Sequence, residues 1–74
     1  MNNIQFDESL YKKLSPRELE VARAARAGQS LKETAAALNV KVSTIGAHRS
    51  QIMKKLGCQN ITACVVSLIE AGIL

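Results

Sequence analysis

The sequence predicts an all-α domain of four helices. Apolar residues recur at spacings of three and four along four segments, which is the period of a helix that buries one face. Each of the four segments is followed by a Gly or an Asn, the residues that most readily end a helix in a left-handed conformation. Phe6 and Tyr11 are the only residues of the Phe, Tyr and Trp type. The core must therefore consist of aliphatic side chains, which suits packed helices.

The chain has 74 residues, which is enough for one domain. Hydrophobic residues make up 47% of it, a fraction that is ordinary for a globular protein and argues against disorder. Residues 1–13 carry the weakest pattern. We interpret them as an N-terminal extension in which residues 7–13 could form a short helical turn. Residues 14–74 then form the domain.

The first two predicted helices each begin with a capping box. In the first, Ser15 is the N-cap, Glu18 lies three residues later, and Pro16 occupies the first helical position. This helix is predicted to run to Ala27. The second begins after Ser30 and ends near Asn39. One face of it is formed by residues at helical spacing, namely Leu31, Thr34, Ala35 and Leu38.

The third predicted helix follows a tight connection over residues 39–41. It begins at Val42 or Ser43 and ends at Leu56 before Gly57. Its inward stripe consists of Ile45, Ile52 and Leu56.

The fourth predicted helix begins after Asn60 and runs to about Ala71. Eight of its residues are apolar and they lie on nearly every side, so this helix must be buried on more than one face. In a domain this small, a second copy of the chain is the simplest cover for the other face. We expect Ile61, Val65, Leu68 and Ile69 at this interface. A strand at residues 64–66 is an alternative, but no partner strand is evident.

The formal net charge is +4, and from Lys41 onward Glu70 is the only acidic residue. The basic residues of this half are Lys41, Arg49, Lys54 and Lys55. Such a distribution fits a polyanionic partner such as DNA. A solvated helix face explains it equally well on charge alone.

Several other classes of function are disfavoured. One His and two Cys do not supply the ligands of a structural zinc site, and no nucleophile–base pair or phosphate-binding loop is evident, so we expect neither a metal, nor a cofactor, nor catalysis. The thiols of Cys58 and Cys64 should be reduced. No signal peptide or membrane-spanning run is evident, so we expect a cytoplasmic protein.

A short helix followed by a tight turn and a longer basic helix is the arrangement of a helix-turn-helix, whose second helix fits the major groove of DNA. The sequence here resembles the LuxR/FixJ-type helix-turn-helix domains of bacterial transcriptional regulators. The resemblance is carried by Leu14–Val21 (LSPRELEV), Gly28–Leu38 (GQSLKETAAAL) and Ser43–Gly57 (STIGAHRSQIMKKLG). It implies four helices, the third in the major groove, and dimerisation through the fourth.

The same resemblance places Gly46, Ala47 and Ser50 at the base edges. All three are small, and the family commonly has Lys in place of Gly46. Either the backbone approaches the groove closely, with Ala47 on a thymine methyl group and Ser50 bonded to a base, or base readout is weak. The chain also departs from the family where Leu, Ile, Ser and Arg are common, at Ala22, Thr34, Lys41 and Ile61. In the family the Ser at the position of Lys41 caps the third helix, and Ser43 is the alternative cap here.

We expect the DNA phosphates to be contacted by Ser43, Thr44, His48, Arg49 and Lys54. The predicted function is that of a transcriptional regulator that binds a two-fold site on double-stranded DNA as a homodimer. The alternative is a protein-interaction module that pairs with a larger regulator through residues 61–71 and reads little DNA itself. RNA polymerase is a further candidate for a protein partner.

Overall fold

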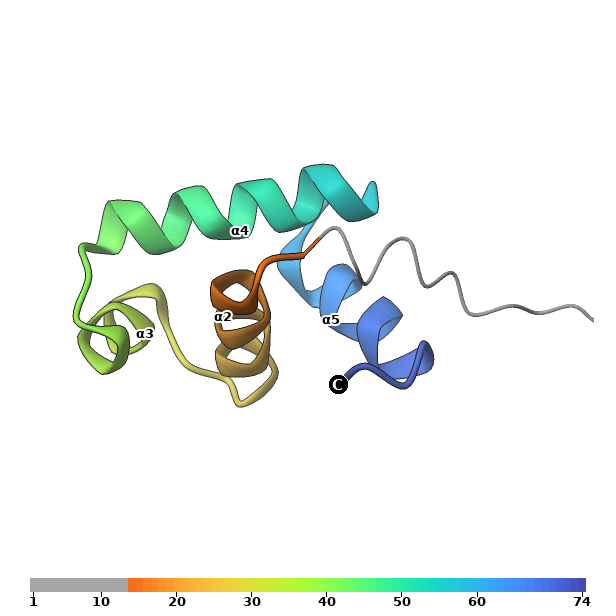
Figure 1. Ribbon diagram of the computed structural model, residues 1–74, viewed down its shortest axis with the longest axis horizontal. Helices are drawn as coiled ribbons and strands as arrows, with labels where there is room; N and C mark the ends of the chain where they lie inside the picture. Colours follow the sequence, from red (N-terminus) through yellow and green to blue (C-terminus); the bar gives the residue numbers. More distant parts are fainter. Residues whose placement is uncertain (1–13) are drawn as a thin grey trace, which may run out of the picture.

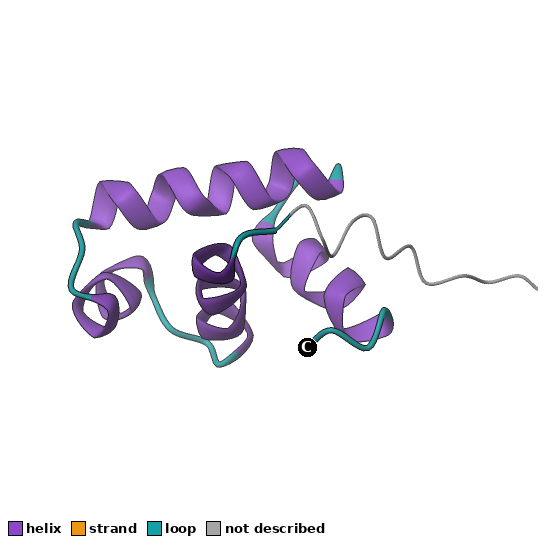
Figure 2. Cartoon of the chain, in the orientation of Figure 1, coloured by secondary structure: helices purple, strands orange, loops and turns teal. Residues whose placement is uncertain are grey.

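The computed structural model describes residues 14–74. These residues form four helices and no strand: α2 (Pro16–Arg26), α3 (Leu31–Leu38), α4 (Val42–Leu56) and α5 (Ile61–Glu70), joined by short loops (Figures 1 and 2). The predicted all-α fold of four helices is confirmed. The strand considered for residues 64–66 is wrong, because these residues lie within α5. The helical turn expected at residues 7–13 lies outside the described residues.

Local hydrogen bonds decide where three of the helices begin. In α2 the Glu18 N–H donates to Ser15 Oγ at 3.1 Å, and the Ser15 N–H donates to Glu18 Oε1 at 2.9 Å. Ser30 and Glu33 make the same reciprocal pair at the start of α3. Asn60 Oδ1 accepts from the Ala63 N–H at the start of α5. Such caps satisfy N–H groups that a helix leaves unpaired, each stabilising by about 1 kcal/mol.

The short turn between α3 and α4 depends on Asn39. Its φ of 59° and ψ of 47° are left-handed, a conformation that Asn adopts more readily than other residues with a side chain. The reversal ends α3 and lets α4 begin three residues later. At the other end of α4, Gly57 has a φ of 71° and closes the helix in the same way.

One aliphatic core joins all four helices. The buried residues of this cluster are Leu14, Val21, Ala22, Ala35, Ile45, Ile52, Cys64 and Leu68, and Val65 of α5 is buried as well. In Figure 1, α4 runs along one edge of the domain, and α3, α2 and α5 lie beneath it. α4 contacts all three of these helices, so only one of its sides is left to solvent.

The interface residues expected on α5 need correction. Val65 is 7% exposed and Leu68 1% exposed, so both belong to the core of the domain and are not available to a second copy. They are buried because α5 packs this side against α2 and α4. The exposed apolar side chains of α5 are Val66 at 46% and Ile69 at 40%. Of the expected interface residues, Ile69 is exposed, and Ile61 is partly buried against the core.

Candidate nucleic-acid interface

α4 presents a row of exposed side chains to solvent. Ser43, Ala47, Ser50 and Lys54 follow one another at spacings of four, three and four, so they lie on one side of the helix. Gln51, also exposed, lies beside this row. We call these five residues the outward face of α4. Ile45 and Ile52 on the opposite side are fully buried, which holds this face away from the rest of the domain.

The middle of the outward face is built from small side chains. Ala47 and Ser50 form its centre, and the half-exposed Gly46 lies at its edge. A Cβ atom added to Gly46 would meet nothing within 4 Å. Packing therefore does not require glycine at this position, although glycine inside a helix costs about 1 kcal/mol relative to alanine. The small residues leave the α4 backbone open to close approach by a partner.

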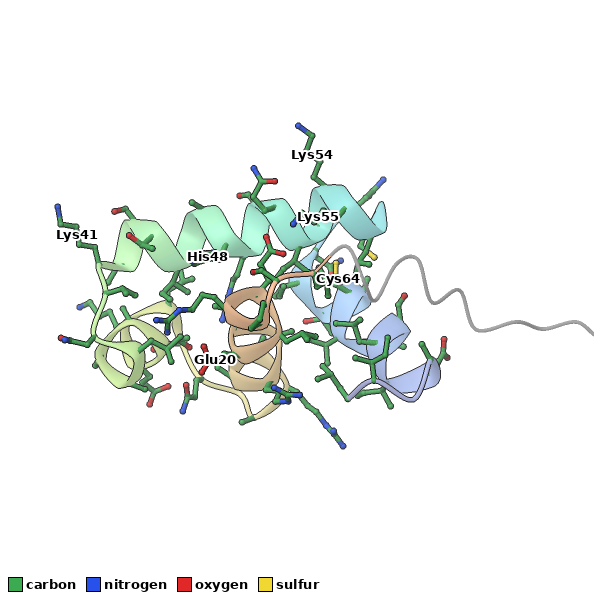
Figure 3. All side chains as sticks on the ribbon, viewed as in Figure 1. Glu20, Lys41, His48, Lys54, Lys55 and Cys64 are labelled. Atoms are coloured by element: carbon green, nitrogen blue, oxygen red, sulfur yellow. The ribbon has the colours of Figure 1, made fainter. Side chains whose placement is uncertain are left out.

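Two lysines mark the ends of this surface. Lys41 precedes the first turn of α4 and Lys54 lies in the last turn, and Figure 3 shows both side chains pointing away from the other helices. Lys54 lies 13 residues after Lys41, and this separation corresponds to about 20 Å along a helix. Neither lysine takes part in the ion pairs formed within residues 14–74. A polyanion lying along α4 would meet a positive charge at either end.

The N-terminus of α4 has no side-chain cap. Lys41 occupies the N-cap position, and its carbonyl oxygen accepts from the N–H groups of Thr44 and Ile45. The sequence-based suggestion that Ser43 caps this helix is wrong, because Ser43 already lies inside it. Ser43 is exposed and Thr44 half-buried at this end of the helix. The unpaired N–H groups of the first turn and the helix dipole favour an anion there.

The missing cap leads to a stability prediction for Lys41→Ser. A serine at the N-cap can accept from an N–H of the first turn, so the free energy of unfolding should rise by about 1 kcal/mol. Urea unfolding followed by circular dichroism at 222 nm measures this change. The control is Lys32→Ser, which makes the same replacement at an exposed position inside α3 and should not stabilise the domain. A gain no larger than that of the control would contradict the expectation.

Arg49 does not lie on the outward face. Its Nη2 donates to the backbone carbonyl of Gln29 at 3.1 Å, and its Nε is shielded from solvent, with no hydrogen-bond partner within residues 14–74. The sequence assigned Arg49 to a DNA phosphate. In the structure its guanidinium instead donates to the connection between α2 and α3, so the assignment to a phosphate has no support.

His48 and Lys55 also lie toward the body of the domain. His48 is half-buried, three residues after Ile45 and four before Ile52, and therefore shares their side of α4. The Lys55 ammonium donates to Glu18 Oε1 of α2 at 2.8 Å. His48 was expected to contact a phosphate, but it lies on a side of α4 that faces away from Lys54 (Figure 3).

The carboxylate of Glu18 links the cap of α2 to α4. Burial by itself would raise the pKa of Glu18, but the hydrogen bonds from Lys55 and the Ser15 N–H, together with the positive charges of Lys55 and His48, hold this pKa below its ordinary value of 4.5. A carboxyl group whose pKa is lower in the folded state stabilises the fold above its unfolded pKa. That contribution is lost as the pH falls through the folded pKa.

We therefore expect the free energy of unfolding to decrease as the pH is lowered below about 4.5, partly through Glu18. Glu18→Gln keeps a side chain that suits the capping box but removes the charge. It should cost about 1 kcal/mol at pH 7 and weaken the dependence on acid. Urea unfolding at pH values between about 3 and 7 measures both the loss of stability at pH 7 and the dependence on acid.

Glu20→Gln is the matched control for this prediction. Glu20 lies on the same helix, is exposed, and within residues 14–74 makes a 3.5 Å pair with Arg17. Exposed pairs of this kind contribute little, so this variant should keep both the stability and the acid dependence of the unmodified protein. If Glu18→Gln and Glu20→Gln had the same free energy of unfolding and the same dependence on pH, the pair between Glu18 and Lys55 would not be the cause of the acid dependence.

Other chemistry is sparse in the described part of the chain. Residues 14–74 contain no cluster of three or more His, Cys, Asp or Glu side chains that could hold a metal ion. Burial raises the pKa of the Cys64 thiol to about 12, with a further contribution from the neighbouring Cys58 thiol, and both cysteines are free. Among the described helices, none has the length and apolar character needed to cross a membrane.

Two residues of this surface were missed as contacts by the sequence analysis. Gln51 lies four residues after Ala47, so the helical period alone could have placed it on the same side. Lys41 was counted among the basic residues of this half of the chain but was not assigned a contact. Ser43, Ala47, Ser50 and Lys54 do lie together on one exposed row.

One comparison with known proteins gives a family match for most of the described residues. Residues 12–68 match the family model GerE, which is described as bacterial regulatory proteins, luxR family. The match covers well over half of the chain and includes α2, α3 and α4 and most of α5. A comparison with curated proteins finds no match.

Proposed function

Since the chain belongs to the LuxR family of bacterial regulatory proteins, we propose that it regulates transcription by binding a two-fold site on double-stranded DNA as a homodimer. The outward face of α4 is the observation that carries this proposal. It lies along the free side of α4, with Lys54 at one end and Lys41 just before the other, and an α-helix of this kind fits the major groove of B-DNA. A bacterial regulator of this type acts in the cytoplasm.

The phosphates are contacted at the two ends of α4. Lys41 and Lys54 neutralise phosphates there, and Ser43 and Thr44 donate hydrogen bonds beside the uncapped N-terminus. Such contacts set the position of the domain on the duplex but carry no sequence information of their own.

The base edges are read by short side chains. Gly46 lets the helix backbone approach the groove floor, Ala47 packs on a thymine methyl group, and Ser50 bonds to a base. Gln51 adds the one long amide of the outward face, which suits the paired donor and acceptor of adenine. Specificity then depends on how closely α4 enters the groove.

The exposed apolar side chains of α5 support the homodimer. Val66 and Ile69 lie three residues apart on one side of α5, so a second copy can cover both. Two recognition helices related by a two-fold axis read half-sites about 34 Å apart, or a multiple of that spacing.

Fluorescence anisotropy with a labelled duplex tests the DNA-binding function. The logarithm of the binding constant should fall linearly with the logarithm of the salt concentration. Each phosphate contact contributes about 0.9 to the slope, so the two lysines alone predict a slope of about −1.8 per protomer. A binding constant that does not depend on salt, or the absence of binding at low salt, would exclude the proposal. Selection of bound duplexes from a random pool then reports whether the preferred site is a palindrome.

A protein-interaction module is the second candidate function. The small side chains at the centre of α4 and the exposed Val66 and Ile69 favour it, because an interaction through α5 needs no DNA readout. Analytical ultracentrifugation separates the two candidates. A homodimer supports the DNA-binding regulator, whereas a monomer without DNA affinity supports a module that pairs with a larger regulator.

A further inference from the structure

We propose that Arg49 is a positioning residue, which holds α4 at the angle needed for DNA binding without touching the DNA itself. This inference rests on the proposed function. Its first support is the 3.1 Å hydrogen bond from Arg49 Nη2 to the carbonyl oxygen of Gln29, 20 residues earlier in the chain. The bond joins the middle of α4 directly to the connection between α2 and α3.

The guanidinium of Arg49 bonds to the domain itself and is partly shielded from solvent. Arg49 Nε is shielded from solvent and finds no acceptor within the described residues, so the side chain is packed in place around the one bond that it makes. Turning it outward to reach a phosphate would break the bond to Gln29. Arg49 also lies four residues after Ile45 and three before Ile52, on the inward half of α4.

The connection that receives this bond is itself held from α3. The hydroxyl of Thr34 is buried, within 2.9 Å of the Ser30 carbonyl oxygen and 3.3 Å of Gln29 Oε1. Thr34 of α3 and Arg49 of α4 therefore both contact the connection between α2 and α3. Together they tie α2, α3 and α4 through three polar groups near residues 29 and 30.

The outward face makes the position of α4 unusually important. A long side chain can change rotamer to follow a displaced base, but Ala47 and Ser50 have no length with which to compensate. Hydrogen bonds weaken steeply outside a narrow range of distance and angle. A small rotation of α4 should therefore remove base contacts before it removes the contacts of the long lysine side chains to phosphates.

The experiment compares Arg49→Met with Lys54→Ala and Gln29→Ala. Binding to a labelled random-sequence duplex and to a duplex enriched by selection is measured by anisotropy over a series of salt concentrations. Arg49→Met should leave the salt slope unchanged, because no phosphate contact is lost. It should lower the ratio of the two affinities about tenfold, the equivalent of one hydrogen bond from a charged group.

The other two variants serve as controls. Lys54→Ala should reduce the slope by about 0.9 and weaken binding to both duplexes alike. Gln29→Ala keeps the backbone carbonyl that accepts from Arg49. It removes the 3.3 Å contact of Thr34 but leaves the shorter one to the Ser30 carbonyl oxygen, so this variant should resemble the unmodified protein. If Arg49→Met also reduced the slope by about 0.9 with an unchanged affinity ratio, Arg49 would be a phosphate contact and the inference would be overturned.

A measurement on the unmodified protein covers the case in which Arg49→Met does not fold. The Nε–H of Arg49 is shielded, so its proton should exchange slowly enough to give a nuclear magnetic resonance signal at neutral pH. The random duplex should leave this signal in place. A rapidly exchanging Nε–H in the free protein would overturn the inference alone, whereas failure of the unmodified protein to bind either duplex would overturn the proposed function.

Discussion

Ala47→Glu should abolish DNA binding while the domain stays folded. Ala47 is exposed at the centre of the outward face, between the positions of Ser43 and Ser50. A carboxylate placed there would point at the groove between two rows of phosphates, and like charges brought together at an interface cost several kcal/mol. The affinity for any duplex should therefore fall at least about 100-fold. Anisotropy at low salt measures this loss.

The fold should tolerate the same substitution. Glu is a good helix former, so an exposed Ala→Glu change inside a helix costs only about 0.5 kcal/mol or less. Circular dichroism at 222 nm and urea unfolding check that the variant is intact. Ala27→Glu is the matched control, because Ala27 is exposed at the end of α2 that lies away from α4 (Figure 1). Equal losses of affinity in both variants would point to net charge, not to the outward face, as the cause.

Ile52→Ala should be the most destabilising of the substitutions considered. Ile52 is fully buried in the core beneath α4, so truncation removes apolar contact and leaves a cavity. Such changes cost about 2–5 kcal/mol. Small domains lie near the lower end of the usual stability range of about 5–15 kcal/mol, so much of the stability would be lost. Urea unfolding followed by circular dichroism gives the free energy.

Val42→Ala provides the comparison for this loss. Val42 is also an aliphatic residue of α4, but it is 42% exposed in the first turn. Its truncation should change the free energy of unfolding by about 0.5 kcal/mol or less. If Ile52→Ala cost no more than Val42→Ala, the packing of α4 on α2 and α5 would not be what holds the outward face in place.

The sequence predicted most of the fold because the signals are local. Ser15 and Glu18, and likewise Ser30 and Glu33, are three residues apart, so their reciprocal hydrogen bonds form wherever a helix begins. The left-handed turn at Asn39 follows from the properties of one residue. The helical period also placed Ile45 and Ile52 on the inward side of α4, whereas the family resemblance placed Ala47 and Ser50 toward the DNA.

The roles of Arg49 and His48 could not be found in this way. A basic residue on a basic helix resembles a phosphate contact until its partner is known, and the partner of Arg49 is a backbone carbonyl 20 residues away. Every residue has such a carbonyl, so no sequence pattern marks it as an acceptor. The pair between Lys55 and Glu18 spans 37 residues and is equally invisible in the local pattern.

The limits of the helices and the apolar side of α4 could be predicted from the sequence, because they depend on residues within about one or two turns of each other. The family could be predicted as well, because its pattern follows the order of residues along the chain. The buried side of α5, by contrast, became known from the folded domain alone. α5 is apolar on nearly every side, so periodicity could not separate Val65 and Leu68 in the core from Val66 and Ile69 at the surface. The packing of α5 against α2 and α4 made that choice.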